Sequence, residues 1–108
     1  TLHLMFEAQY NDLWLSMDLI AERIRSLGEY APVGEQIGAK SQLPGDKGVP
    51  DAKAMISNLV EGNELLARSA RTALKTAEEA GDQASADLMT QRVAVTEKTA
   101  WMLRAMAK

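Results

Sequence analysis

The stretch TLHLMFEAQYNDLWLSMDLIAERIRSLG, residues 1–28, decides how the rest of the chain is interpreted. At about 100° per residue, its apolar side chains fall on one stripe, as in an amphipathic helix. Gly28 is expected to end this helix, because a helix terminus commonly needs a residue with positive φ. The predicted apolar stripe consists of Leu2, Met5, Phe6, Leu13, Met17, Ile20, Ala21, Ile24 and Leu27.

Beside the apolar stripe lie four side chains of the types that bind metal ions. They form two (i, i+4) pairs, His3 with Glu7 and Asp18 with Glu22, within roughly 100° of arc on a 3.6-residue helix. At about 1.5 Å per residue, Glu7 and Asp18 are about 16 Å apart along the helix. The two pairs therefore cannot form one site within a single helix.

The four positions are symmetric about a point between Asp12 and Leu13. If two copies of the helix pack antiparallel about a two-fold axis at that point, His3 and Glu7 of one copy face Asp18 and Glu22 of the other copy. A two-fold dimer makes self-complementary contacts of this kind. The spacing thus predicts two equivalent metal sites shared between subunits. The alternative is that Glu7, Asp18 and Glu22 are solvated charges on a helix face.

Composition indicates a single all-α domain over residues 1–108. Hydrophobic residues make up 46% of the chain, and the three prolines all lie between Pro32 and Pro50. The absence of cysteine excludes disulfides and thiolate metal sites, and it fits a reducing cytoplasm, the expected location. The net charge of −3 argues against general nucleic-acid binding. The sequence contains no apolar run of about 18 residues, so no membrane-spanning helix is predicted.

Two further long helices are predicted after a connection over residues 29–50, in which Gly34–Lys40 is a candidate short helical turn. Pro50 and Asp51 are expected to open the first of these helices, which continues to about Ala80. Gly62 inside it is interpreted as a mark of close helix packing. Its apolar stripe consists of Met55, Ile56, Leu59, Val60, Leu66, Ala70, Ala73, Leu74 and Ala77.

Gly81 and Asp82 read as a helix stop followed by an N-cap, with the last helix running from about residue 83 to 107. The short link makes the last two helices antiparallel neighbours. The predicted apolar face of the last helix consists of Ala86, Met89, Val93, Ala100, Leu103 and Ala107. Three long helices with broad apolar stripes form an incomplete bundle, so we expect a fourth helix before Thr1, in a longer natural protein.

The segments LHLMFEAQYNDLWLSMDLIAERIRSLG and GDQASADLMTQRVAVTEKTAWMLRAM resemble the second and last helices of the Dps family, the DNA-binding proteins from starved cells. The most specific elements are His3 with Glu7 and the phrase DLIAER at residues 18–23. The resemblance implies a ferritin-like four-helix subunit of a hollow twelve-subunit shell. It also implies oxidation of iron(II) by peroxide at two-fold interfaces, with storage of the ferric mineral.

In the resemblance, His3 and Glu7 match the histidine and acid from one subunit. Asp18 and Glu22 match the two carboxylates from its two-fold mate. Many relatives have aspartate at the position of Glu7. The family supplies a further histidine from its first helix, which is not in this chain, and His3 is the only histidine here.

Other residues receive roles only through the resemblance. Acidic residues near the start of the last helix line three-fold iron pores in the family, so Asp82 and Asp87 are candidate pore residues. For Asp82, however, N-capping is a complete alternative explanation. Arg23 is either an inter-subunit ion pair or an ordinary surface ion pair. For Tyr10 and Trp14, packing at the interface is favoured over electron donation.

The favoured function is therefore iron storage and detoxification by a ferroxidase, with iron and peroxide as substrates and further copies of the chain as partners. The alternative is a truncated, non-catalytic helical module that self-associates through its apolar stripes. DNA binding is not expected, because the family's DNA binding commonly depends on a lysine-rich tail that this chain does not contain. The lone histidine has no glutamate three residues before it, which disfavours the paired Glu-x-x-His sites of other ferritin-like proteins.

Overall fold

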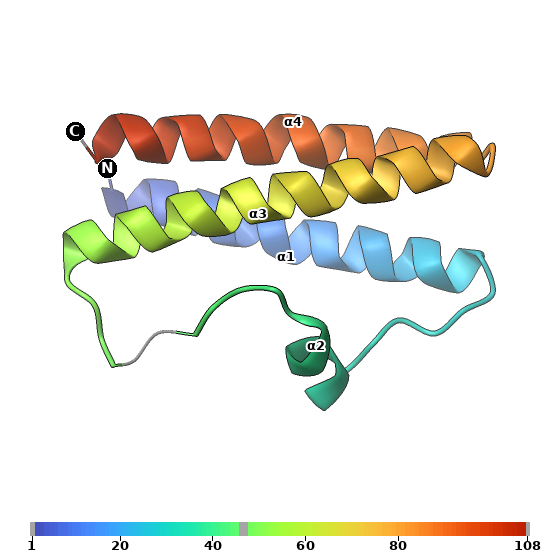
Figure 1. The fold of residues 1–108 in the computed structure, drawn as a ribbon, viewed down its shortest axis with the longest axis horizontal. Helices are drawn as coiled ribbons and strands as arrows, with labels where there is room; N and C mark the ends of the chain where they lie inside the picture. Colours follow the sequence, from blue (N-terminus) through green and yellow to red (C-terminus); the bar gives the residue numbers. More distant parts are fainter. Residues whose placement is uncertain (1, 46–47, 108) are drawn as a thin grey trace. The chain divides into compact units, whose positions relative to one another are not determined.

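The computed structural model describes residues 2–45 and 48–107, and over these residues the chain contains helices and no strand (Figure 1). The elements in order are α1 (Leu2–Ser26), α2 (Glu35–Lys40), α3 (Ala52–Glu79) and α4 (Gln83–Met106). The prediction of three long helices with a short helix in the connection is confirmed. Thr1, before which a further helix was expected, lies outside the described residues.

The chain divides into two compact units, one ending at Ser41 and the other beginning at Gln42. The first unit contains α1 and α2, and the second contains α3 and α4. We describe each unit by itself, and the single domain over residues 1–108 stays a prediction. No helix in the described part of the chain is long and apolar enough to cross a membrane.

Helix α1 ends where the sequence predicted, at a glycine with positive φ. Gly28 has a φ of 97°, and its N–H donates to the carbonyl of Arg25 at 3.0 Å. The N–H of Glu29 donates to the carbonyl of Ile24 at 3.2 Å, which completes a Schellman motif. The guanidinium of Arg25 lies 4.1 Å from the ring centroid of Tyr30, so a cation–π contact also holds this end.

Helix α3 begins at an aspartate N-cap. The side chain of Asp51 accepts a hydrogen bond from the N–H of Ala54 at 2.8 Å. Pro50 was expected inside the first turn of this helix. In the structure it lies before the N-cap residue Asp51 and is therefore outside the helix. Within the second unit, Gly62 does not lie against another helix, so its interpretation as a mark of close helix packing has no support there. A Cβ there would lie 3.6 Å from Leu43 Cδ2 of the connection, an ordinary contact distance.

A short turn joins α3 to α4 and makes them antiparallel neighbours, as predicted (Figure 1). Gly81, at a φ of 72°, donates to the carbonyl of Glu78, and the N–H of Asp82 donates to the carbonyl of Ala77. This is a second Schellman motif, and it reverses the chain within a few residues.

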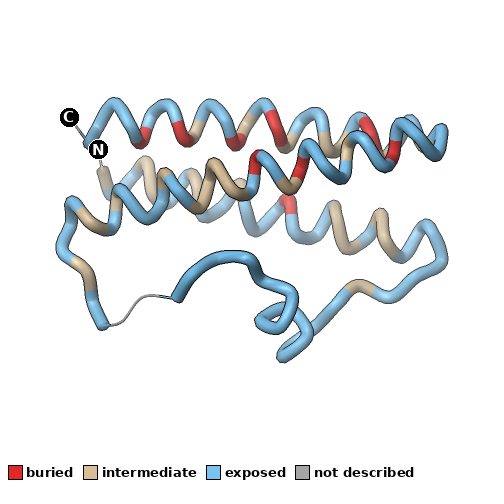
Figure 2. The backbone as a smooth tube through the Cα atoms, in the orientation of Figure 1, coloured by how far each residue is buried: buried red, intermediate tan, exposed pale blue. Residues whose placement is uncertain are grey.

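The buried residues of the second unit are mostly small and lie along both of its helices (Figure 2). Small side chains allow the two helix backbones to approach closely, and Leu103 is the largest side chain that is completely enclosed. The buried set is Ala67, Ala70, Ala77, Ala86, Val93, Thr96, Ala100 and Leu103. Four of the six residues on the predicted face of α4 are in this set, which confirms most of that face.

On α1, the predicted apolar stripe is less buried than its composition suggested. Leu2, Phe6 and Ile20 are half-buried, whereas Leu13, Met17 and Leu27 are 39%, 55% and 55% exposed. The prediction that these three residues belong to the buried side is therefore wrong for the single chain.

Candidate metal centre on α1

His3 and Glu7 form a side-by-side pair near the start of α1. Their Nε2 and Oε2 atoms are 3.8 Å apart, and the side chains are 91% and 58% exposed. The helix places them one turn apart, so both side chains project from the same face. An imidazole nitrogen and a carboxylate oxygen at this separation can both bind one metal ion between them, a combination that suits iron.

Asp18 and Glu22 form the second pair, also one turn apart and both exposed. The rise of the helix keeps this pair about 16 Å from the first. Over residues 2–45 and 48–107, no three His, Cys, Asp or Glu side chains gather into a metal-binding group. The structure therefore places His3 beside Glu7, as predicted. A single chain does not bring this pair and the Asp18–Glu22 pair into one site.

Two aromatic residues lie between the two ligand pairs along α1, with Trp14 on the arc that carries the ligands and Tyr10 beside that arc. The rings of Tyr10 and Trp14 are stacked, with centroids 6.4 Å apart and an interplanar angle of 18°. Both are strongly exposed in the chain, at 65% and 57%. For these two residues, packing at a subunit interface stays a prediction.

Arg23 is half-buried and interacts with other residues of the chain. Its proposed bridge to another subunit stays a prediction. It is not a fully solvated surface residue, because part of its side chain is covered.

The two candidate pore residues have different surroundings at the start of α4. The carboxylate of Asp82 accepts hydrogen bonds from the N–H of Ser85 at 3.1 Å and from the Ser85 hydroxyl at 2.5 Å. These bonds confirm its N-cap role. Asp87 is exposed and accepts one hydrogen bond from Gln83 Nε2 at 3.0 Å. Asp87 is therefore the more accessible of the two, and its pore role stays a prediction.

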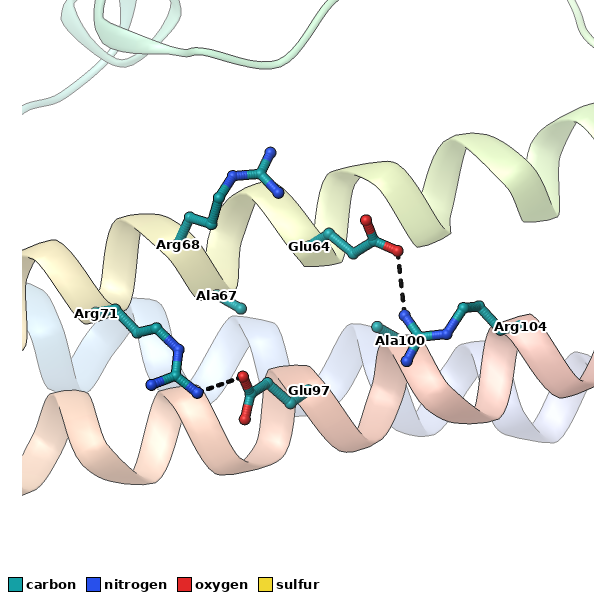
Figure 3. A pocket seen from close by; sticks show the side chains of 7 residues that line it. All are labelled: Glu64, Ala67, Arg68, Arg71, Glu97, Ala100 and Arg104. Atoms are coloured by element: carbon teal, nitrogen blue, oxygen red, sulfur yellow. Dashed lines mark hydrogen bonds and ion pairs between the residues drawn. The ribbon is translucent and has the colours of Figure 1, made fainter.

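A charged surface that was not predicted from the sequence crosses α3 and α4. Arg71 Nη2 lies 2.5 Å from Glu97 Oε2, and Arg104 Nη1 lies 3.1 Å from Glu64 Oε1. Figure 3 shows each guanidinium facing its carboxylate across the two helices. The pairs border an open hollow of about 280 Å³, lined by Glu64, Ala67, Arg68, Arg71, Glu97, Ala100 and Arg104. Helical spacing places these charges on exposed faces, but it does not show which charges of two helices meet.

Known proteins are similar to this chain over nearly its whole length. The ferritin-like domain family matches residues 1–108. An uncharacterized low temperature-induced protein of Nostoc sp. is 38% identical over 96% of the chain, and the chain spans 60% of that relative. A DNA protection during starvation protein of Brevibacillus brevis is 32% identical, with 97% of this chain and 71% of that protein covered.

The fold is also similar to that of a solved relative. The structure of Dps from Thermosynechococcus elongatus superposes with a TM-score of 0.90 at 28% identity, covering 98% of this chain and 68% of that one. The match covers almost the whole chain and so includes α1 and α4, the two helices whose sequences carry the resemblance. The chain belongs to the Dps family of ferritin-like proteins.

Proposed function

We propose that this chain is a subunit of an iron-storing ferroxidase. Each site would combine His3 and Glu7 of one copy with Asp18 and Glu22 of the partner subunit, and the subunits would assemble into a dodecameric shell. The observation that carries the proposal is the accessible His3–Glu7 pair, with 3.8 Å between nitrogen and oxygen. The matching carboxylate pair lies on the same helix at a symmetry-related position.

The proposed ligands suit the chemistry of iron. One imidazole and three carboxylates supply nitrogen and hard oxygen donors, which bind both ferrous and ferric ions and stabilise the more highly charged product. Two ferrous ions supply the two electrons that reduce one peroxide molecule to two water molecules, with uptake of two protons. Carboxylates at the interface also neutralise the positive charge that accumulates as iron is oxidised.

We propose that ferrous ions enter the shell past the carboxylate of Asp87. Its carboxylate is exposed near the start of α4, and the hydrogen bond that it accepts from Gln83 occupies only one of its oxygen atoms, so acceptor capacity is left for a cation. Asp82 is less suited to this role, because its oxygens are held by Ser85.

The test is ferrous oxidation by peroxide, followed by the absorbance of the ferric product, with particle size measured in parallel. Glu22→Gln should abolish most of the oxidation above the buffer rate while particle size is kept. Glu29→Gln is the control, because Glu29 is exposed and lies just beyond the end of α1, away from the ligand arc. A dimer or aggregate without any rate above buffer would support the non-catalytic self-association module instead.

A further inference from the structure

We propose that α3 and α4 present a surface that binds the same surface of a second copy of the chain. The contact uses only the second unit, so it is separate from the two-fold contact proposed for α1 and does not rest on the proposed function. The surface, which we call the charged face, consists of Glu64, Arg68, Arg71, Glu97, Trp101 and Arg104.

The two helices of the charged face carry the same pattern of residues. Each has a glutamate, an alanine three positions later and an arginine seven positions later. These residues are Glu64, Ala67 and Arg71 on α3 and Glu97, Ala100 and Arg104 on α4. Because the helices are antiparallel, the glutamate of each helix meets the arginine of the other, which gives the pairs at 2.5 Å and 3.1 Å (Figure 3). The four charges therefore form a rectangle about 10 Å long, with opposite charges paired across the two helices.

A face with this pattern is complementary to itself. Rotation of a second copy by 180° about an axis parallel to the helices brings its α4 over α3 of the first copy. Arg104 of the partner subunit then lies over Glu64, and Glu97 of the partner subunit lies over Arg71. Each charge has an opposite charge beside it and another above it, which is the self-complementary contact that a two-fold axis produces.

Arg68 and Trp101 favour this rotation over the other possible one. A two-fold axis perpendicular to the helices would also match the four charges, but it would bring Arg68 of both copies together. The axis parallel to the helices instead brings Trp101 of the partner subunit over Arg68, because each residue follows the glutamate of its helix by four positions. Arg68 projects from the side of α3 away from α4 (Figure 3), and Trp101 is 61% exposed. A guanidinium over an indole ring is a favourable cation–π pair, and both residue types are enriched at interfaces.

The centre of the charged face allows two copies to approach closely. Ala67 and Ala100 line the hollow of about 280 Å³, and their side chains end at Cβ. Since α4 has 24 residues, the face is about 36 Å long, and two helices make it about 20 Å wide. The resulting area of about 700 Å² is close to the roughly 800 Å² that each partner contributes to a standard interface. Because charges make up most of the face, we expect a reversible contact that salt weakens.

The first experiment exchanges the charges without removing any pair within the chain. The exchange variant carries Glu64→Arg, Arg71→Glu, Glu97→Arg and Arg104→Glu. Wild-type and exchanged protein are assembled and purified separately, mixed without denaturation, and followed by sedimentation of a fluorescently labelled partner at about 0.01 M ionic strength.

Each protein is expected to bind its own kind. Wild type and the exchange variant should bind each other at least about 10-fold more weakly, because glutamate then faces glutamate and arginine faces arginine. Mixed binding as tight as self-binding, or no self-association of wild type, would overturn the contact.

The second experiment uses single substitutions that leave the four charges in place. Trp101→Ala should weaken self-association several-fold, whereas Tyr30→Ala, which removes an exposed aromatic side chain of the connection, should not. Raising the ionic strength to about 1 M should also weaken it several-fold, since the Debye length falls to about 3 Å. Equal effects of the two substitutions, or binding that salt does not change, would overturn the proposed contact. Ferrous oxidation, measured in parallel, should be unchanged in Trp101→Ala, so the contact and the proposed iron site are tested separately.

Discussion

Arg71 of α3 donates a hydrogen bond to Glu97 of α4, with 2.5 Å between Nη2 and Oε2. The guanidinium and the carboxylate are 57% and 49% exposed, so water screens their attraction. We expect Glu97→Gln to lower the free energy of unfolding by less than about 1 kcal/mol, with a smaller effect at high salt.

Urea unfolding at two salt concentrations measures this effect. Glu64→Gln is the matched variant, because Glu64 makes the corresponding 3.1 Å pair with Arg104 on the same pair of helices. A loss well above about 1 kcal/mol for either variant would show that these pairs are shielded from water in the assembled protein.

Thr96 is expected to be a site where removal of a polar group stabilises the protein. It is 1% exposed, and its hydroxyl has no hydrogen-bond partner among residues 2–45 and 48–107. Thr96→Val keeps the shape and should raise the free energy of unfolding by about 1 kcal/mol, because a buried, unsatisfied hydroxyl is costly.

Thr90→Val is the control for that substitution, because it changes the same residue type on the same helix. The Thr90 hydroxyl donates to the carbonyl of Ala86 at 2.8 Å, so no stabilisation is expected there. Thermal unfolding of both variants compares them directly. Equal shifts in Tm would mean that the hydroxyl of Thr96, although it has no hydrogen-bond partner among the described residues, does not lower the free energy of unfolding.

The N-cap of α4 should contribute measurably to stability. Asp82 accepts two hydrogen bonds from Ser85, and Asp82→Ala removes both acceptors. The expected loss is about 1 kcal/mol in the free energy of unfolding, typical of an N-cap. Asp87→Ala, which removes one exposed hydrogen bond with Gln83, should cost less. The reverse order would contradict the assignment of Asp82 as the cap.

His3 should decide how tightly the proposed site binds metal. His3→Gln removes the one imidazole of the chain. Since loss of even an outer partner of a ligand costs on the order of 10–100-fold in affinity, loss of the ligand itself should cost at least about 10-fold. Calorimetric titration with Zn²⁺, which undergoes no redox reaction, measures this without turnover. Unchanged affinity would remove His3 from the site.

The sequence predicted the helix ends well because each end depends on one local residue. Gly28 and Gly81 supply positive φ, and Asp51 and Asp82 cap helices through their own side chains. These requirements are met within a few residues, so they can be read without knowledge of the fold.

Contacts between helices could not be predicted in the same way. Thr96 lies on the same face of α4 as Val93, Ala100 and Leu103, but it was not part of the predicted apolar face because its side chain carries a hydroxyl group. Arg71 and Glu97 meet only because α3 and α4 take one particular rotation about their axes. The two metal-ligand pairs could be predicted because the period of the helix places the members of each pair one turn apart. A site that combines both pairs would need a second copy of the chain.

The continuous helix of α1 also limits how this part of the gene can vary in length. The first turn with His3 and the later turn with Glu22 belong to one uninterrupted rod from Leu2 to Ser26. Deleting a single residue between them would turn one pair by about 100° relative to the other. A change of length between His3 and Glu22 would therefore disturb both pairs at once, whereas a change of length in the connection after Gly28 would leave their spacing intact.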